Sequence, residues 1–178
     1  MKRHWLAFLL AGMFPAGAAA QARGQQVFIE EGHLAFELPA PQWTFSRRSA
    51  DPRTGVVLFL YTRGLLLDRQ QPPPNLTIAL EKIPAGMDLA AYSAALRASM
   101  QVPFRIEKVF TREDGPIRLR DALGYEGRYQ LRGVERVVRV VHAQHRDLGI
   151  QIIADAPAEA FPAMAPEFAH ILKSLAFK

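Results

Sequence analysis

Two histidines stand three positions apart, in the pattern His142-x-x-His145. On a helix this spacing could present both rings to one metal ion, but the β-branched residues around them indicate a strand. On a strand, residues three apart point to opposite faces and lie about 10 Å apart along the chain. We therefore expect no shared metal site. His142 has apolar neighbours and is expected to be a core histidine with one hydrogen bond.

The sequence contains none of the common catalytic motifs. It has no G-x-S-x-G, no P-loop, no G-x-G-x-x-G and no H-E-x-x-H. The absence of cysteine removes disulfides, a thiol nucleophile and thiolate metal ligands. We expect a non-enzymatic protein with no catalytic residues, no metal and no cofactor. A hydrolase site assembled from distant residues stays open, because a sequence does not show which residues meet in space.

A polar strand face is the first candidate binding surface. Its charges are of mixed sign, which is typical of a solvated face with cross-strand pairs. The alternative is a patch that docks a partner protein, to which two arginines at a hairpin tip could add. The candidate partner-binding residues are Glu126, Arg128, Gln130 and Arg139, with Arg132 and Arg136 at the tip.

The second candidate surface is apolar. Leu65, Leu66 and Leu67 precede the connector of three prolines at residues 72–74. Three consecutive leucines are unusual in a loop, because loops lie at the surface. They continue the strand that begins at Val56, fold as a loop onto the core, or form an apolar lip for a hydrophobic ligand, a membrane or a partner. Together with Tyr125 and Tyr129 they are the candidate ligand-binding residues.

A three-strand antiparallel meander must position most of these side chains. Residues 123–131, 134–145 and 149–155 alternate as strands do, and Arg132-Gly133 is a two-residue hairpin turn. Both faces are apolar for part of their length, so the sheet needs cover on both sides. If Leu131 pairs with Val134, the register predicts these opposite pairs: Tyr129 with Arg136, Glu126 with Arg139, and Tyr125 with Val140.

The remaining elements supply that cover. Asp88 is a good N-cap for a helix over residues 89–100. A second helix is expected near the C-terminus, with one turn ending near Pro162 and the main helix starting with Pro166 in its first turn. Further strands are expected at residues 27–29, 33–38, 43–48, 56–62, 75–83 and 104–111, of which 56–62 is expected to be buried on both faces. The predicted fold class is α/β (α+β): an α/β/α sandwich with a central, mainly antiparallel sheet flanked by helices.

The N-terminus has the order of a secretory signal peptide. Lys2 and Arg3 precede an apolar run over residues 5–14, and small residues at 18–20 provide a cleavage site. The run is about half the ~20 residues that span a bilayer. We expect residues 1–20 to be removed, after Ala20 or Ala22, leaving no transmembrane segment. Residues 21–26 would then be a loose N-terminal segment, and 27–178 a single domain in a periplasmic or secreted protein.

The charge gives little support for nucleic acid as a partner. The formal net charge is +5, with 22 basic and 17 acidic residues among 178, and two of the basic residues lie in the expected signal peptide. Acidic residues are interleaved among the basic ones, and export takes the chain away from nucleic acid. The expected partner is another periplasmic or envelope protein.

Three motifs resemble the PsbP-like family, and together they span most of the expected mature chain. The first is Phe36-Glu37-Leu38-Pro39 with Trp43 four residues further on, and the second is Gly124-Tyr125-Glu126-Gly127 with Tyr129. The third is Asp155-Ala156-Pro157, followed by a Phe-bearing helix and Ile171-Leu172-Lys173-Ser174-Leu175. Leu175 stands where the family more often has phenylalanine, and this chain has no cysteine to carry a lipid.

The resemblance implies the α/β/α fold and a bias toward non-catalytic binding roles, and it supplies no active-site residue. Three hypotheses follow. The first is a periplasmic interaction module. The second is a carrier of a small hydrophobic ligand or lipid, which would use Leu65–Leu67 and a gap between helix and sheet. The third is a hydrolase, which needs His142 or His145 within hydrogen-bond reach of a serine or a carboxylate in a cleft.

Overall fold

The structure is a computed structural model that describes residues 24–39, 41–64, 72–100 and 104–178. The expected signal peptide and the three leucines at 65–67 lie outside these residues. The small elements at the two ends of the described chain are β1 (Gln25–Ile29), the 3-10 turn η1 (Glu30–Gly32), β2 (Leu34–Leu38) and β10 (Ala176–Phe177). The others are β3 (Trp43–Ala50), β4 (Val57–Arg63), β5 (Asn75–Lys82), α1 (Leu89–Ser99), β6 (Arg105–Phe110), β7 (Ala122–Leu131), β8 (Val134–His145), β9 (Leu148–Pro157) and α2 (Phe161–Ser174).

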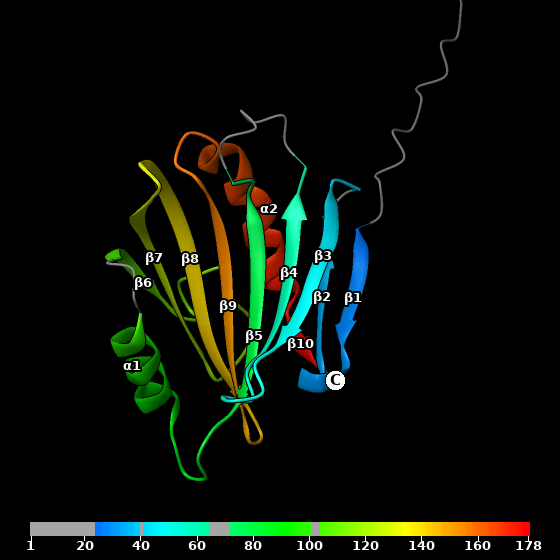
Figure 1. Ribbon diagram of the computed structural model, residues 1–178, viewed down its shortest axis with the longest axis vertical. Coiled ribbons are helices and arrows are strands. Elements are labelled where there is room, and N and C mark those ends of the chain that lie inside the picture. Colours follow the sequence, from blue (N-terminus) through cyan, green and yellow to red (C-terminus); the bar gives the residue numbers. More distant parts are fainter. Residues whose placement is uncertain (1–23, 40, 65–71, 101–103) are drawn as a thin grey trace, which may run out of the picture.

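The strands form two antiparallel sheets. The large sheet has seven strands in the order β3-β4-β5-β9-β8-β7-β6, and the small sheet has three in the order β1-β2-β10 (Figure 1). The predicted meander is confirmed as β7, β8 and β9. Its register is also confirmed, because Leu131 pairs with Val134 and Glu126 with Arg139. A two-residue turn with both residues at positive φ, Arg132 at 52° and Gly133 at 80°, closes the first hairpin.

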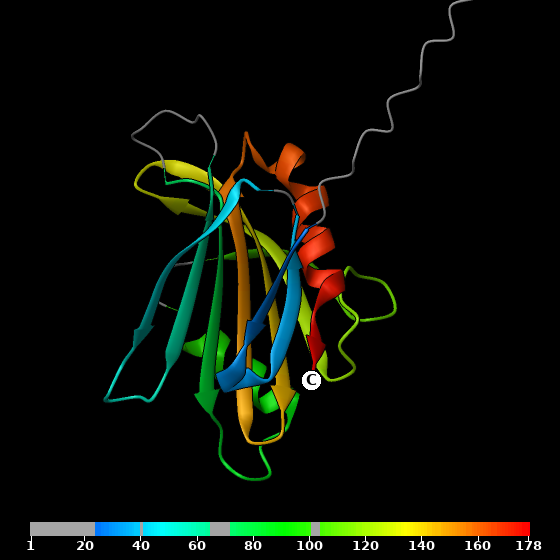
Figure 2. The ribbon, with the colours of Figure 1, turned by 90° about the vertical axis from the view of Figure 1, so that its right-hand side faces the viewer.

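The two faces of the large sheet are covered differently. The small sheet and α2 lie together over one face, and α1 lies over the other face at β7 and β8 (Figures 1 and 2). The expected sandwich with helical layers on both sides is therefore only partly correct. The fold is a sheet-dominated mixed α+β, because residues 25–38 and 176–177 pair with each other and supply part of one layer.

The main core lies between the large sheet and the layer of α2 and the small sheet. The small sheet contributes Leu34, Phe36 and Leu38, and α2 contributes Phe168 and Leu172, all of them buried. From the large sheet come alternate residues of each strand, which face the same side. They include Phe59, Tyr61, Leu76, Ile78, Leu80, Val141, Ile150 and Ile152.

Strand β4 differs from its prediction. Phe59 and Tyr61 are buried, whereas Leu58 and Leu60 on the other face are half-buried. The expectation that this strand is buried on both faces is wrong, because α1 covers β7 and β8 and does not extend over β4.

Both helices follow local sequence signals, with one correction. The carboxylate of Asp88 accepts from the Ala91 N–H at 2.7 Å and caps α1 as predicted. The predicted break between Pro162 and Pro166 is wrong, because α2 runs without interruption through both. Pro166 removes only the hydrogen bond to the carbonyl of Pro162, which lies in the exposed first turn and is free to bind water.

Neither α1 nor α2 is long and apolar enough to cross a membrane, within the ranges that the structure describes.

Candidate functional site

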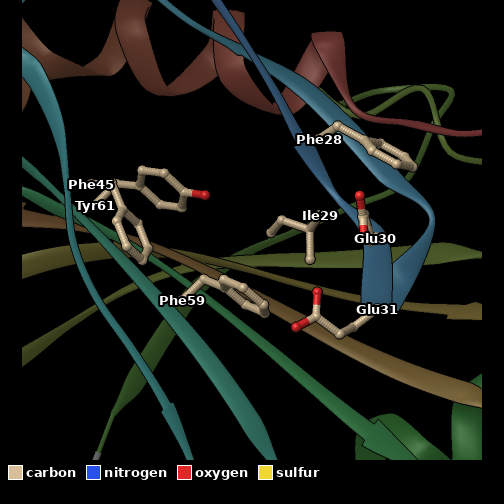
Figure 3. Close-up of a pocket in the computed structure, with 7 residues that line it drawn as sticks. All are labelled: Phe28, Ile29, Glu30, Glu31, Phe45, Phe59 and Tyr61. Atoms are coloured by element: carbon tan, nitrogen blue, oxygen red, sulfur yellow. The ribbon is translucent and has the colours of Figure 1, made fainter.

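An open groove of about 760 Å³ lies where the two sheets diverge (Figure 3). One wall is the end of β1 with η1, and the other is the β3–β4 hairpin. Phe28, Ile29, Phe45, Phe59 and Tyr61 give the groove its apolar surface. Glu30 and Glu31 line the η1 side of the groove.

Two phenylalanines that border this groove are exposed. Phe45 lies beside the ring of Tyr61, whereas Phe28 lies at the rim, with its ring on the face of β1 opposite to Ile29 and directed away from the other rings (Figure 3). Phe28 is 51% and Phe45 is 56% accessible to solvent, although large apolar side chains are usually buried. Phe45 packs against Tyr61 at a ring-centroid distance of 5.4 Å, and Tyr61 packs in turn against the buried Phe36 at 5.5 Å. The aromatic surface therefore continues from solvent into the core, and its position is fixed by that packing.

Local backbone features place these side chains. The pairing of β3 with β4 shifts register between Phe45 and Arg47, which marks a β-bulge at Ser46. On the other wall, His33 adopts the left-handed conformation, with φ 46°, and turns the chain from η1 into β2. Because β1 and β3 are edge strands of their sheets, neither has a second partner strand in the described part of the chain. Two strand edges therefore border the groove.

Charges of both signs stand beside the groove. Arg48 donates to Glu31 across it, with Nε 3.0 Å from Oε1. Burial, and secondarily the nearby charge of Glu31, raises the pKa of Tyr61 to about 12. The Tyr61 hydroxyl is therefore neutral at physiological pH, and it can act as a hydrogen-bond group for a ligand but not as an anion.

The predicted polar face is confirmed as one strand surface, and most of its charges are paired. Arg139 donates to Glu126 at 2.6 Å and to the carbonyl of Ala165 in α2 at 3.1 Å, so it fastens α2 to the sheet. Arg128 bonds to Glu107 and Glu135 on the surface. Gln130 and Arg132 are exposed at the hairpin end. That this polar face docks a partner protein stays a prediction.

Arg136 corrects the prediction for the hairpin tip. Its side chain is 0% exposed and lies on the opposite face from Arg128 and Arg139, beside Tyr129. Arg136 Nη2 lies 2.8 Å from Asp155 Oδ2, and its guanidinium also donates to the carbonyls of Pro72 and Pro73. The prediction missed this because an arginine in a strand reads as a surface residue unless its buried carboxylate is known.

His142 lies in a buried hydrogen-bonded cluster beneath α1. Gln151 Nε2 donates to His142 Nε2 at 3.2 Å, so the other ring nitrogen carries the proton and donates to Ser93 Oγ at 2.8 Å. The Ser93 hydroxyl is also 2.7 Å from that of Tyr125. The prediction of a core histidine is confirmed, with two hydrogen bonds in place of one.

This contact between Ser93 and His142 bears on the hydrolase hypothesis. The histidine is within reach of a serine, as that hypothesis requires, but Ser93 is 1% and His142 0% exposed, so a substrate cannot reach either. In the tautomer set by Gln151 the histidine also donates to the serine and cannot accept its proton. The arrangement joins α1 to the sheet.

His145 lies on the other face of β8, as predicted. Its ring stacks on Phe177 at 4.2 Å and contacts His33 edge-on at 6.5 Å. No group of three histidine, aspartate or glutamate side chains suited to a metal ion occurs within the described ranges.

A small apolar pocket of about 190 Å³ lies beside the end of α1. Met100, Phe104 and Tyr129 line it, together with Val138, Val140 and Ile153 of the sheet. Tyr129 thus lies where the ligand hypothesis expects it, whereas Tyr125 is buried in the cluster beneath α1. Leu65, Leu66 and Leu67 lie outside the described residues, so this part of the hypothesis stays untested.

Sequence reasoning missed the groove residues Phe28 and Phe45. Phe28 and Phe45 belong to the strands expected at residues 27–29 and 43–48, but the groove forms between these two segments, and nothing in the sequence relates one to the other. One local signal was present: Phe45 is followed by Ser46-Arg47-Arg48, which is polar enough to mark an edge strand.

Solved structures with a similar fold are known. The solution structure of cyanobacterial PsbP from Synechocystis sp. PCC 6803 matches with a TM-score of 0.60 and 14% identity, over 93% of this chain and 99% of that one. LpqN of Mycobacterium tuberculosis, described as involved in cell envelope biogenesis, matches with a TM-score of 0.55 and 20% identity, over 86% and 90%. The Ran-binding protein Mog1p of Saccharomyces cerevisiae matches with 0.55 and 10%, over 88% and 96%.

The chain therefore has the PsbP-like fold, which confirms the resemblance seen in the three sequence motifs. At these identities the likeness concerns the fold alone. Neither a family model nor a curated protein matches the sequence.

Proposed function

We propose that this protein is an exported, non-enzymatic binding module that holds an extended segment of another envelope protein in the groove between β1 and β3. The observation that carries the proposal is the pair of half-exposed phenylalanines, with Phe45 beside the aromatic floor of that groove and Phe28 at its rim. A large exposed aromatic surface held in place by core packing is typical of an interaction site.

The shape of the groove favours a polypeptide over a small molecule. It is an open channel bordered by two strand edges and not a closed cavity. An extended segment can donate and accept hydrogen bonds along such an edge while its alternate side chains enter the apolar floor. Small-molecule sites instead enclose most of the ligand surface.

The charges beside the groove favour a foreign segment over a second copy of this chain. Arg47 and Arg48 lie side by side on β3 and are exposed. Antiparallel pairing of two β3 strands would bring these arginines of two copies together, and like charges on paired edges are unfavourable. We therefore expect a partner segment that carries bulky apolar side chains and an acidic residue facing Arg47.

The test is selection of extended peptides by the purified chain. Panning a random peptide library should enrich sequences with alternating bulky apolar residues and an acidic position. In amide NMR spectra, the enriched peptides should shift the signals of β1, η1 and β3. The double variant Phe28→Ala/Phe45→Ala should weaken binding at least about tenfold, since buried aromatic anchors contribute ~2 kcal/mol or more.

Val109→Ala is the matched control. Val109 is 50% exposed on β6, the opposite edge of the large sheet, and it does not line the groove. Binding should survive this change. Enrichment of no peptide, or equal loss in the two variants, would refute the groove as the binding site.

The exported location is part of the same proposal and rests on the order of residues 1–20. N-terminal sequencing of the chain recovered from the periplasm should begin at Gln21 or Arg23. A chain that keeps Met1 and stays inside the cell would refute it.

A carrier of a hydrophobic ligand is the second candidate, favoured by the apolar pocket beside α1. Its volume of about 190 Å³ is below the ~300–1,000 Å³ typical of ligand cavities, so the ligand would be a short apolar chain. Native mass spectrometry of the purified chain should then show a copurified mass, which the change Val140→Phe should remove by filling the pocket. A single apo mass would argue against this candidate.

A further inference from the structure

A further pocket, distinct from the groove and from the apolar pocket beside α1, is lined mainly by positively charged side chains. It has a volume of about 210 Å³ and is lined by Arg112, Gly115, Ile117, Arg118 and Lys173. Three of its five lining residues are cations and none is a carboxylate. The loop between β6 and β7 supplies the arginines, and the last turn of α2 supplies the lysine (Figure 2).

None of the three cations has a direct ion-pair partner in the part of the chain that the structure describes. Within the described ranges, no carboxylate oxygen lies within the ion-pair distance of 4.0 Å of Arg112, Arg118 or Lys173. Six other arginines form at least one such pair: Arg48, Arg63, Arg105, Arg128, Arg136 and Arg139. What distinguishes Arg112, Arg118 and Lys173 is that these unpaired cations line the same pocket. Like charges brought together without a counter-ion repel one another, so a bound anion would stabilise the arrangement.

The carboxylates that lie nearest in the sequence are engaged elsewhere. Asp114 accepts from the N–H of Thr111 at 2.6 Å, and Glu113 accepts from the hydroxyl of the same threonine at 2.6 Å. These bonds, with Thr111 the largest cause in each case, lower the pKa of both carboxyl groups. Glu113 still lowers the net potential at Arg112, so we expect Arg118 and Lys173 to contribute most to binding an anion.

The loop that carries the arginines is held in one conformation. Ile117 and Leu119 are buried and anchor it in the core. The bonds of Thr111 to Glu113 and Asp114 close its first turn. A loop fixed at both points needs little further ordering of its backbone on binding, so the remaining cost is that of ordering the exposed arginine side chains.

We infer that this pocket binds a phosphoryl or sulfuryl oxyanion between Arg118, Lys173 and Arg112. A guanidinium matches two oxygens of a tetrahedral oxyanion, and an ammonium adds a point charge. The pocket has room for a phosphate group with part of its attached molecule. The ligand is either a small phosphorylated solute or a phosphate-bearing lipid headgroup. Both carry the phosphoryl oxyanion that the three cations would bind.

A structural role for Lys173 has to be separated from binding. It lies in the last turn of α2, where a cation stabilises the negative end of the helix dipole. That role would change the stability of the protein on substitution but would produce no saturable response to phosphate. The test therefore measures binding directly.

The experiment is a titration of the purified chain with inorganic phosphate and then pyrophosphate, followed by amide NMR at constant ionic strength. Signals of Gly115, Arg118 and Lys173 should shift and saturate, and chloride at the same ionic strength should not reproduce the shifts. The variant Arg118→Gln/Lys173→Gln should bind at least about tenfold more weakly, because it loses the charge-assisted hydrogen bonds of both side chains.

Two controls keep the result specific. Arg53→Gln removes an exposed arginine from the β3–β4 turn and should leave phosphate binding unchanged. The groove variant Phe28→Ala/Phe45→Ala should also keep it, so failure of this inference is distinguishable from failure of the proposed function. Shifts that never saturate, shifts equal to those with chloride, or full binding by the double variant would overturn the inference.

A last arm identifies the source of the phosphate. The chain is sedimented with vesicles of phosphatidylcholine with and without phosphatidic acid. Sedimentation that requires phosphatidic acid and is lost in Arg118→Gln/Lys173→Gln supports a lipid headgroup. Saturable binding of pyrophosphate without sedimentation supports a solute.

Discussion

Arg63, at the end of β4, forms a two-point ion pair with Glu167 of α2. Arg63 Nη2 lies 2.7 Å from Glu167 Oε1, and Arg63 Nε lies 2.8 Å from Oε2. The indole nitrogen of Trp43 in β3 donates to the same carboxylate at 2.8 Å. One partly buried glutamate therefore joins both strands of the groove wall to the helix that packs on the sheet.

The change Glu167→Ala should destabilise the protein by about 2–3 kcal/mol, because it leaves a guanidinium and a buried indole N–H without their shared acceptor. Urea unfolding measures the difference. Glu159→Ala, at an exposed position before α2, is the control and should alter stability by less than ~0.5 kcal/mol. Equal effects of the two changes would show that the contact contributes nothing.

The buried pair of Arg136 and Asp155 should behave differently from a surface pair. Arg136→Met leaves the buried carboxylate of Asp155 without its cation and should lower the free energy of unfolding by about 3–5 kcal/mol. The double change Arg136→Met/Asp155→Leu should recover more than half of that loss, because it removes both charges. Arg132→Met, at the exposed hairpin tip, serves as the control in the same unfolding series.

These variants also decide what Arg136 does for binding. If Arg136→Met abolished partner binding with no loss of stability, the structural assignment would be wrong, and the residue would act at a surface after all.

The stability of the protein should fall as the solution is acidified through the range set by His142. Burial, and secondarily the charge of Arg97, lowers the pKa of this histidine from 6.5 to about 4. Between pH 6.5 and 4 the unfolded chain therefore binds a proton that the folded chain excludes. The free energy of unfolding should drop by up to ~1.4 kcal/mol per pH unit in that window.

The comparison that isolates this effect is His142→Gln. Glutamine does not titrate, so the variant should lack this part of the pH dependence, and its stability deficit at neutral pH should shrink as the pH falls. Urea unfolding across the window measures both proteins. Parallel curves for the two would contradict the assignment.

Gly127 allows β6 to lie close to β7. A Cβ built there would come within 2.2 Å of the carbonyl oxygen of Arg105, which is backbone and cannot move aside alone. Gly127→Ala should therefore destabilise the protein by about 1–3 kcal/mol through overpacking. Gly64→Ala is the control, because the nearest atom to its Cβ would be 3.9 Å away. Thermal unfolding of the two variants checks the difference.

The glycine also explains one sequence motif physically. Gly124-Tyr125-Glu126-Gly127 carried part of the resemblance to the PsbP-like family. Gly124 lies under the ring of Phe110, Gly127 lies against the β6 backbone, and the two residues between them bond to α1 and to Arg139.

The meander could be predicted because its information is local. The turn Arg132-Gly133 sets the register, and alternation then assigns every side chain of β7 and β8 to a face. The N-cap Asp88 is local in the same sense. Pairing partners on the charged face, such as Glu126 with Arg139, followed directly from that register.

The groove and the cationic pocket could not be predicted in this way. Phe28 and Phe45 lie on different sheets, and Arg118 and Lys173 lie on a loop and a helix far apart in sequence. Nothing in the local pattern relates the members of either pair. The burial of Arg136 could not be predicted for the same reason. Its partner Asp155 lies on β9, and the two residues come together only when β8 and β9 pair.

The two-residue strand β10 pairs with β2, and Lys178 N–H donates to the carbonyl of His33 at 2.8 Å. The small sheet thus joins the earliest described strands to residues 176–177, and this contact spans nearly the whole domain. During synthesis, residues 25–38 cannot complete that sheet until residues 176–177 have left the ribosome. Such long-range closure slows folding, and it makes the small sheet the last part of the domain that can be completed.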